Sequence, residues 1–347
     1  MTLVRWGIFG TGAMAEMFAA ALSQVPGAVL HGVASRSRGC AGEFATRCGI
    51  LHTYSGYAEL LRDPAIDIVY IATRNEYHHD DSLAAINSGK GVLCEKPFAL
   101  NASEGRRVVQ AARRRGVFCT EAMWMRFSPA VRAVVEIVRS NGIGPLGLVS
   151  AQLGVHVPFD SNHRVYAKPG GGSLYDFGVY PLSFTHALLG SPIQVSSQAL
   201  IGPTGVDEQF TALLEYGSGC QALIGASVRT TLGNTAAMYG TDGQIDLIGG
   251  LYYPDGYEKK MIDATVSTHR SGRPSIGLRL WRRLSCHLPE IRFGRASGHS
   301  IREGYACEAS AVQRCLQAGV LESPEIPLDE TIEILELMDT IRNRWTQ

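Results

Sequence analysis

Residues 4–15 read Val-Arg-Trp-Gly-Ile-Phe-Gly-Thr-Gly-Ala-Met-Ala, an apolar run that passes directly into two closely spaced glycines. The pattern Gly-x-Gly-x-x-Ala, from Gly10 to Ala15, is typical of the turn that joins the first strand of a Rossmann domain to its first helix. Gly10 permits the tight turn, and Gly12 lets a pyrophosphate approach the backbone. The helix N-terminus then offers free N–H groups to the phosphates. We expect dinucleotide binding by Gly10, Thr11, Gly12, Ala13 and Met14; the alternative is a glycine turn without a ligand.

Short apolar runs alternate with amphipathic stretches through the first 120 residues, which indicates a parallel sheet covered by helices. Asn101, with Glu104 three residues later, predicts the start of one helix, and Gly116 predicts its end. The fold class is therefore a doubly wound α/β Rossmann domain over residues 1–122. We expect its strands at 5–10, 29–35, 67–72, 91–94 and 117–120, and its helices at 14–22, 40–48, 79–88 and 102–115.

Beyond Pro129 the pattern changes. Strands are predicted at 148–157, 211–216 and 222–229, in sequence without intervening helices, after a helix at 130–139. This indicates an α+β domain with a largely antiparallel or mixed sheet over residues 123–347, and its final helix, 331–347, could pack back on the first domain. The basic segment 275–300 has no clear pattern; a lid, a partner contact and a substrate-selective loop are all open for it.

Composition narrows the class of protein. The chain has 347 residues, enough for two domains, and its 32 basic residues balance its 32 acidic ones, which disfavours nucleic acid and anionic membranes as partners. Neither a signal peptide nor an apolar run long enough to span a membrane is visible. Eight cysteines occur without a Cys-x-x-Cys pair, so we expect reduced thiols, no metal site and a cytoplasmic location.

The end of the second predicted strand suggests which dinucleotide binds. An NAD site usually places an acid there for the ribose hydroxyls, but this strand ends Ala34-Ser35-Arg36-Ser37-Arg38, and no acid occurs between Glu16 and Glu43. A guanidinium group binds a 2′-phosphate, which a carboxylate would repel. Ser35, Arg36 and Arg38 therefore predict NADP rather than NAD, unless they only form a solvated loop.

Residues 91–101, Gly-Val-Leu-Cys-Glu-Lys-Pro-Phe-Ala-Leu-Asn, place Lys96 just after a buried strand. Ligands bind at the carboxyl ends of such strands, and Pro97 forces a turn that would aim the lysine into the crevice. If residues 170–186 are helical, Asp176 and Tyr180 share one face, and a nearby cation lowers the pKa of a phenol. The three residues predict an acid–base centre; a surface lysine, a helix cap and a core tyrosine are the alternatives.

Four ordered motifs carry a resemblance over nearly the whole chain. They are the glycine loop, Cys94-Glu-Lys-Pro-Phe-Ala-Leu-Asn, Glu121-Ala-Met-Trp-Met-Arg-Phe-Ser-Pro and Gly170-Gly-Gly-Ser-Leu-Tyr-Asp-Phe-Gly-Val-Tyr-Pro. Together they resemble the Gfo/Idh/MocA oxidoreductase family. Within it the chain is most similar to the branch of dimeric dihydrodiol dehydrogenases, NADP-dependent D-xylose 1-dehydrogenases and glucose-fructose oxidoreductase, because Tyr180 stands where inositol dehydrogenases have histidine. Arg74 departs from the proline of many relatives.

The resemblance implies roles for single residues. Lys96 would hold the substrate oxygen and lower the pKa of Tyr180, Tyr180 would exchange the proton, and Asp176 would position substrate or lysine. A cis Lys96–Pro97 bond is one way to aim that lysine inward. Further cofactor contacts are implied at Thr73, Asn75, His78, Glu95, Lys96 and Arg126, and further substrate contacts at Trp124, Phe127, His156 and Phe159.

These observations predict an NADP-dependent oxidoreductase that transfers hydride between the nicotinamide and a carbon bearing a hydroxyl or carbonyl in a sugar, cyclic polyol or dihydrodiol. The resemblance also suggests a homodimer formed through the sheet of the second domain. Two alternatives stay open: a ketosugar reductase of nucleotide-linked sugars, whose phosphate the segment 275–300 would hold, and a cofactor-sensing regulator without catalysis. An intact Lys96, Asp176 and Tyr180 argues against the regulator.

Overall fold

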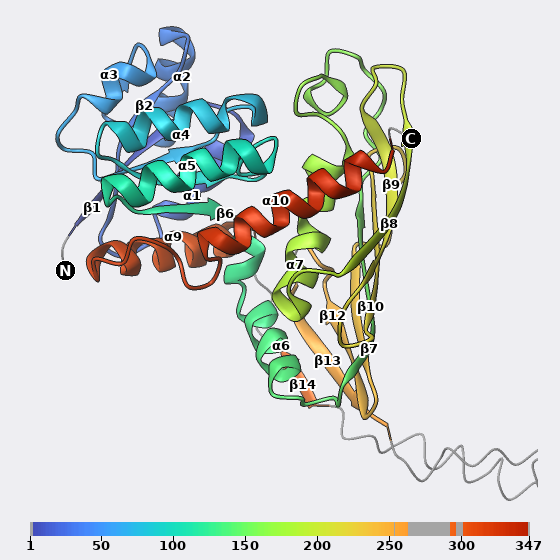
Figure 1. Cartoon of the computed structure of the whole chain (residues 1–347). Coiled ribbons are helices and arrows are strands. Elements are labelled where there is room, and N and C mark those ends of the chain that lie inside the picture. Colours follow the sequence, from blue (N-terminus) through green and yellow to red (C-terminus); the bar gives the residue numbers. More distant parts are fainter. Residues whose placement is uncertain (1–2, 253, 263–291, 296–300, 346–347) are drawn as a thin grey trace, which may run out of the picture.

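A computed structural model describes residues 3–252, 254–262, 292–295 and 301–345; side chains are left undescribed at 38, 292–295, 301 and 302. Most of the basic segment 275–300 therefore lies outside the described residues. Two sheets form the body of the molecule, and two long helices from the end of the chain connect them (Figure 1). Among the helices in the described part, none is both long and apolar enough to cross a membrane.

The first sheet is parallel and has six strands in the order β3-β2-β1-β4-β5-β6. This confirms the doubly wound α/β prediction. The order reverses between β1 and β4, and ligands bind at such a reversal, beyond the carboxyl ends of the strands. The strands are β1 (Val4–Phe9), β2 (Ala28–Ala34), β3 (His52–Tyr54), β4 (Ile68–Ile71), β5 (Gly91–Glu95) and β6 (Cys119–Ala122). The helices are α1 (Ala13–Leu22), α2 (Arg38–Cys48), α3 (Tyr57–Leu61), α4 (His78–Asn87) and α5 (Ala102–Arg115).

The predicted boundaries of α5 are confirmed in detail. Asn101 Oδ1 accepts a hydrogen bond from the Glu104 backbone N–H at 2.9 Å, and Gly116 ends the helix with φ +63°. Strand β3 had no predicted counterpart, because three residues give too short an alternating pattern to separate from a loop. Helix α3, with five residues, likewise had no predicted counterpart. The sequence thus located the elements with strong periodicity and missed two short ones.

The second sheet has eight strands in the order β14-β13-β12-β11-β7-β10-β9-β8. Only β7 and β10 pair in parallel, so the sheet is mixed, as predicted. Helices α6 (Pro129–Arg139) and α7 (Val179–Leu189) lie on one face, and no helix of the described residues covers the other face (Figure 1). The strands are β7 (Leu146–Gly154), β8 (Gln194–Ile201), β9 (Asp207–Glu215), β10 (Gln221–Ser227), β11 (Thr235–Gly240), β12 (Gly243–Ile248), β13 (Gly256–Met261) and β14 (Arg292–Arg295).

Two C-terminal helices return to the first domain. Helix α9 (Ile301–Gln317) packs on α1, and α10 (Leu328–Asn343) runs from α5 to α7 and β8. Two glycines allow these helices to approach their neighbours closely. A Cβ at Gly105 of α5 would lie 2.5 Å from Leu335 Cδ1 of α10, and a Cβ at Gly304 of α9 would lie 2.5 Å from Trp124 Cε3. The expected return of the last helix is therefore present, and α9 joins it.

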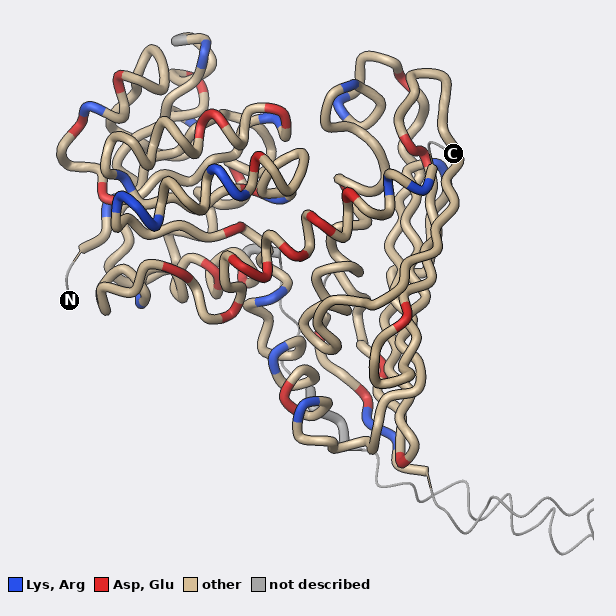
Figure 2. The backbone as a smooth tube through the Cα atoms, viewed as in Figure 1, with Lys and Arg blue, Asp and Glu red and all other residues tan. Residues whose placement is uncertain are grey.

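Acidic residues line α10 and meet arginines from neighbouring elements (Figure 2). Arg113 binds Asp329 at 2.8 Å on the surface. Arg126, by contrast, is 6% exposed and pairs with Glu330, and its Nη2 donates to the Glu325 carbonyl at 2.9 Å. Burial by itself would raise the pKa of Glu330, but bonds from His186 and Arg126 outweigh it and lower that pKa to about 2. Arg126 therefore fastens α10 to the middle of the molecule.

This contrast predicts unequal effects of two neighbouring substitutions. Glu330→Gln should lower the free energy of unfolding by about 3 kcal/mol, since it leaves the buried Arg126 without its carboxylate. Asp329→Asn, the matched control, should cost less than ~1 kcal/mol because its ion pair is exposed. Urea unfolding measures both.

The pH dependence of the Glu330→Gln effect has a defined sign. The pKa of Glu330 is lowered in the folded protein, so its contribution is complete above the ordinary value of 4.5 and fades as the pH falls toward about 2. Equal destabilisation by both substitutions, or a loss that grows with acidity, would contradict the assignment.

Candidate active site

A cavity of about 660 Å³ opens at the carboxyl ends of the parallel strands. The first domain contributes the glycine loop after β1, the end of β2 and the turns after β4 and β5. The second domain closes the cavity with residues from four separate places in the chain. The residues from that domain are Arg164, Gly170, Asp176, Phe177 and Tyr252.

The glycine loop has the shape needed for a pyrophosphate. Gly10 has φ +95°, and a Cβ there would lie 2.6 Å from the Ala72 carbonyl oxygen, so only glycine fits. Gly12 is the N-cap of α1, and a Cβ there would have no atom within 4 Å. The helix N-terminus is thus open to the cavity, where its N–H groups can bind phosphate. Gly10, Thr11, Gly12, Ala13 and Met14 all line this end.

The end of the cavity next to β2 is lined by a cation, aromatic rings and an acid. Arg36 Nη1 donates to the Tyr77 hydroxyl at 3.3 Å, and its guanidinium carbon lies 5.1 Å from the centroid of that ring. Ser35 and Tyr57 complete the lining on the β2 side. Asp81 faces them from α4 and accepts a hydrogen bond from Thr73 Oγ1 at 2.7 Å. Burial raises the pKa of Asp81 to about 6.

His78 connects the turn that carries Lys96 to the end of β4. Its Nδ1 lies 2.8 Å from the Pro97 carbonyl oxygen and its Nε2 lies 3.2 Å from that of Thr73. The ring is 1% exposed, and burial lowers its pKa. The Lys96–Pro97 bond is cis. His78 therefore lies between both turns at the centre of the cavity, and as a neutral imidazole it has one N–H to donate to one of the two carbonyl oxygens.

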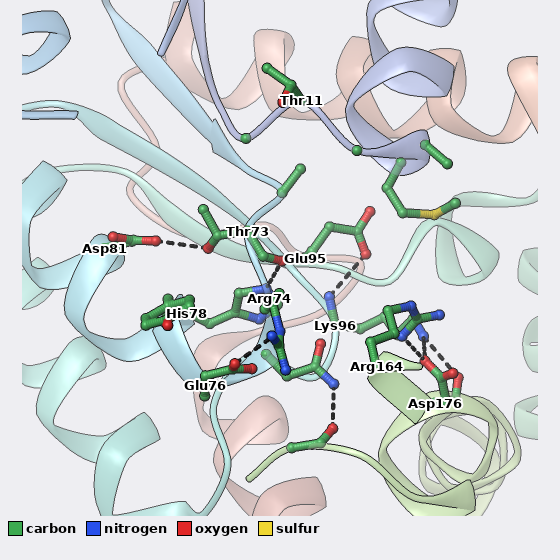
Figure 3. A pocket seen from close by; sticks show the side chains of 18 of the residues that line it. Thr11, Thr73, Arg74, Glu76, His78, Asp81, Glu95, Lys96, Arg164 and Asp176 are labelled. Atoms are coloured by element: carbon green, nitrogen blue, oxygen red, sulfur yellow. Dashed lines mark hydrogen bonds and ion pairs between the residues drawn. The ribbon is translucent and has the colours of Figure 1, made fainter. Parts of the chain in front are cut away.

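Lys96 and Asp176 meet across the two domains (Figure 3). Lys96 Nζ donates to the Asp176 carbonyl oxygen at 2.8 Å and lies 3.7 Å from its carboxylate Oδ1. The same Oδ1 accepts a bond from Arg164 Nη1 at 2.7 Å. Burial lowers the pKa of Lys96, although Asp176 opposes this. The cavity wall therefore contains a largely buried ammonium that lies between a backbone carbonyl and a carboxylate.

Glu95 lies behind Lys96 and has fixed partners. Its Oε1 accepts bonds from the hydroxyls of Tyr70 and Tyr305, the second at 3.2 Å, and its Oε2 accepts the Lys96 backbone N–H at 3.2 Å. Burial raises the pKa of Glu95. Asn75 provides a second tie, because its Nδ2 donates to the Gly170 carbonyl oxygen of the other domain at 2.8 Å.

Tyr180 differs from its expected setting. It lies at the start of α7, directly after the π-helical turn η4 (Leu174–Gly178) that carries Asp176, and it is 1% exposed. Lys96 Nζ lies 5.0 Å from the centroid of its ring, over the face of the phenol. Burial raises the pKa of Tyr180 well above its usual value. The net direction is set by burial, and the prediction that Lys96 lowers this pKa stays a prediction.

Several predicted contact residues lie outside the cavity lining. Trp124 is buried and packs edge-on against Tyr180, with ring centroids 6.5 Å apart. Phe127 is buried in the core, and Arg126 pairs with Glu330 of α10. His156 Nδ1 lies 2.7 Å from the Arg229 carbonyl oxygen, and Phe159 is exposed and packs on Tyr166. The side chain of Arg38 lies outside the described residues.

Sequence reasoning missed several residues of the cavity, among them Arg164, Tyr252 and Asp81. Arg164 and Tyr252 belong to no motif, and nothing in their neighbours in sequence distinguishes them from surface residues. Asp81 could have been predicted from the sequence. It lies in the first turn of α4, the helix that follows β4, and this end of the helix borders the same crevice as the end of β2. Arg74, noted as unusual, also lines the cavity, where its Nε lies 2.9 Å from Glu76 Oε1.

The residues fit a nicotinamide dinucleotide along the whole cavity. The glycine loop can hold the phosphates, polar and aromatic groups line the end next to β2, and Lys96 lies at the end next to β5. When bound, that cofactor supplies or accepts the hydride, and the protein binds, orients and handles the proton. The fold and the site together define a nicotinamide-dependent dehydrogenase.

Comparison with known proteins gives the family. Residues 4–123 match the model described as "Oxidoreductase family, NAD-binding Rossmann fold", and residues 131–246 match the GFO/IDH/MocA C-terminal domain. The chain belongs to the GFO/IDH/MocA family. It is 32% identical over 343 residues to trans-1,2-dihydrobenzene-1,2-diol dehydrogenase of Bos taurus, covering 98% of this chain and 96% of that protein. The Mus musculus protein of the same name is 33% identical over 346 residues, with the same coverage.

Solved structures show the same fold. A levoglucosan dehydrogenase in complex with NADH and levoglucosan matches with TM-score 0.83 at 20% identity, covering 99% of this chain and 98% of the other. A 3-ketoreductase from Actinomadura kijaniata, a mutant in complex with TDP-benzene and NADP, matches with TM-score 0.79 at 20% identity and the same coverage. The predicted family is thus confirmed.

Proposed function

We propose that this dehydrogenase uses NADP to transfer hydride to or from a carbon bearing a hydroxyl or carbonyl in a sugar, cyclic polyol or dihydrodiol. The contact between Lys96 and Asp176 carries the proposal. It fixes a buried cation at the end of the cavity opposite Arg36, so one continuous space can hold the nucleotide with a substrate oxygen beside Lys96. An ammonium there stabilises the negative charge that develops on that oxygen.

The remaining contribution of the protein is to orient the substrate and the nicotinamide and to exclude water from them. Hydride passes between two carbon atoms without a covalent intermediate on the protein, so rates depend on how closely the reacting groups are held. Tyr180 and Lys96 would assist the proton transfer, and Asp176 would keep Lys96 in place. Curated relatives at about 32% identity are named as dihydrodiol dehydrogenases, which supports a cyclic diol among the candidate substrates.

A substrate screen tests this function. Wild-type protein with NADP or NADPH should change the nicotinamide absorbance with a substrate from one class among aldoses, inositols, dihydrodiols and ketosugars. Lys96→Met should lose turnover by roughly 10²-fold or more, since the charge on the substrate oxygen is no longer stabilised, and should still bind nucleotide. Nucleotide binding without turnover of any class would favour a cofactor-sensing regulator, and full activity of Lys96→Met would exclude a role for the lysine.

The preference for NADP depends on Arg36. Arg36→Asp should weaken NADP binding by roughly 10- to 100-fold, because a charge-assisted bond to the 2′-phosphate is replaced by repulsion, and should affect NAD much less. Titrating both nucleotides into the protein by fluorescence measures the two affinities. Arg47→Asp on α2, half-exposed, paired with Glu16 and outside the cavity, is the matched control. An unchanged ratio of NADP to NAD affinity would remove Arg36 from the site.

The face of the second sheet that no described helix covers supports a homodimer. Leu223 is 48% exposed on β10 and stands beside Leu213 of β9, and Tyr239 on β11 stands beside Leu148 of β7. Leu200 and Ile248 add to the exposed apolar surface on the outer strands. Apolar side chains exposed on one face of a sheet favour an interface there, and a second copy presents the same self-complementary face.

Light scattering tests the dimer. The wild type should have the mass of a dimer, and Leu223→Arg should have that of a monomer, since it places an unpaired charge at the centre of the apolar face. Leu51→Arg, on the first domain and 89% exposed, is the control and should stay dimeric. A monomeric wild type, or a dimer that tolerates Leu223→Arg, would contradict an interface on this face.

A further inference from the structure

Asp81 places a carboxylate at the end of the cavity next to β2, although no acid follows β2 itself. It lies in the first turn of α4 and lines the cavity together with Ser35, Arg36 and Tyr57. Its neighbour Asp80 does not line the cavity, and the side chain of Asp80 is 81% exposed. Of these two adjacent acids, only Asp81 therefore borders the space that a nucleotide would fill.

One oxygen of the Asp81 carboxylate is bonded, and the other is open. Oδ2 accepts a hydrogen bond from the Thr73 hydroxyl at 2.7 Å, which holds the carboxylate in the cavity wall (Figure 3). Among the residues that the structure describes, none donates a hydrogen bond to Oδ1. Because each carboxylate oxygen can accept hydrogen bonds, Oδ1 can accept one from a ligand.

The position of Thr73 indicates which part of a nucleotide lies beside Asp81. A Cβ at Gly10 would lie 3.5 Å from the Thr73 backbone nitrogen, so Thr73 adjoins the glycine loop that can hold the phosphates. Asp81 is therefore tied to a residue close to the phosphates, and the ribose is the part of the adenosine that is joined to them. Arg36, the group suited to the 2′-position of that ribose, lines the same end of the cavity.

A carboxylate and a guanidinium have opposite preferences at the 2′-position. NAD carries a hydroxyl there, which donates a hydrogen bond, and an ionised carboxylate accepts it. NADP carries a phosphate there, which is negatively charged and is repelled by a carboxylate but bound by a guanidinium. The chain therefore has one group for each nucleotide at this end of the cavity.

We propose that Asp81 is a specificity-determining residue whose Oδ1 accepts a hydrogen bond from the ribose 2′-hydroxyl of NAD, so that the enzyme uses NAD as well as NADP. Rossmann domains usually supply this acid at the end of the second strand, whereas here α4 supplies it. Arg36 binds the 2′-phosphate of NADP, and Asp81 binds the hydroxyl of NAD. The inference rests on the proposed function, because it requires a nicotinamide nucleotide in this cavity.

Ionisation of Asp81 governs this contact. Burial raises its pKa to about 6 and Asp80 adds to the rise, whereas the bond from Thr73 and the charge of Arg36 oppose it. Above that pKa the carboxylate repels the 2′-phosphate, and below it the carboxyl group is neutral and the repulsion disappears. The other charged or titratable groups that line this end are Tyr57 of α3, Tyr77 of η1 (Asn75–Tyr77), and Arg74 and Glu76, which pair at 2.9 Å.

Asp81→Asn tests the contact, because it removes the charge, keeps the size and leaves an amide oxygen for Thr73. NAD affinity should fall roughly 10-fold, since a charge-assisted hydrogen bond becomes a neutral one. NADP affinity should rise roughly 3- to 10-fold at about pH 8, since the repulsion is lost. Asp80→Asn, on the same turn of α4 and outside the cavity, is the matched control and should change neither affinity. Fluorescence titration of each nucleotide measures these affinities.

The pH dependence isolates the charge of Asp81. The 2′-phosphate titrates in the same range, but wild type and Asp81→Asn meet the same phosphate, so the difference between them reports Asp81. The two proteins should bind NADP equally at about pH 5, where Asp81 is protonated, and should reach the full difference by about pH 8. A difference that does not change with pH would contradict repulsion by this carboxylate.

Two results would overturn the inference and leave the proposed function intact. In one, Asp81→Asn weakens NAD and NADP equally, which places its contact on the adenine base or another part that both nucleotides share. In the other, Asp81→Asn changes neither affinity while Arg36→Asp still weakens NADP, which excludes a contact between Asp81 and the nucleotide. Urea unfolding shows that each variant is folded. A wild type that binds neither nucleotide is a different result, because it rejects the proposed function itself.

Discussion

The bond from the Lys96 ammonium to Asp176 is the interaction on which the site depends. Lys96 comes from the first sheet and Asp176 from a π-helical turn in the second domain, so the bond joins the two halves at the point where chemistry would occur. A buried ammonium is costly unless it is paired. Here a carbonyl and a carboxylate compensate it, and Arg164 binds the same carboxylate. With one carboxylate between two cations, the group of three is formally +1, which suits an oxygen that becomes negative during reaction.

The rest of the molecule keeps that bond in place. His78 contacts the Pro97 carbonyl oxygen in the turn that carries Lys96, and Glu95 accepts a bond from the Lys96 backbone N–H. Asn75 donates to the Gly170 carbonyl oxygen and so connects the neighbouring turn to the other domain. Helix α9 adds Tyr305 to the partners of Glu95, and α10 adds Glu330 to those of Arg126. The return of two C-terminal helices to the first domain is therefore part of the site, because it fixes both walls of the cavity relative to each other.

How much of this was predictable follows from the distance in sequence between interacting groups. The glycine loop, the cap at Asn101 and the doubly wound sheet depend on local patterns, and all three were predicted. Arg126 was assigned to the cofactor because it sits in a family motif, yet its partner Glu330 is 204 residues away. Strands β8 and β11 to β14 were missed since their short alternating runs gain stability only by pairing across the sheet. Tyr252 owes its place entirely to that long-range packing.

The choice between NADP and NAD shows the same limit of prediction from sequence, and it involves Arg36 and Asp81. The absence of an acid after β2 predicts NADP, but the fold brings Asp81 from α4 to the cavity wall that Arg36 shares. Burial raises the pKa of Asp81 to about 6, and its bond from Thr73 keeps it turned toward β4. A 2′-phosphate there would meet a fixed guanidinium and an acid that is ionised at neutral pH. The preference between the two nucleotides therefore depends on how far Asp81 stands from the phosphate that Arg36 binds, and a count of acids along one strand does not contain that distance.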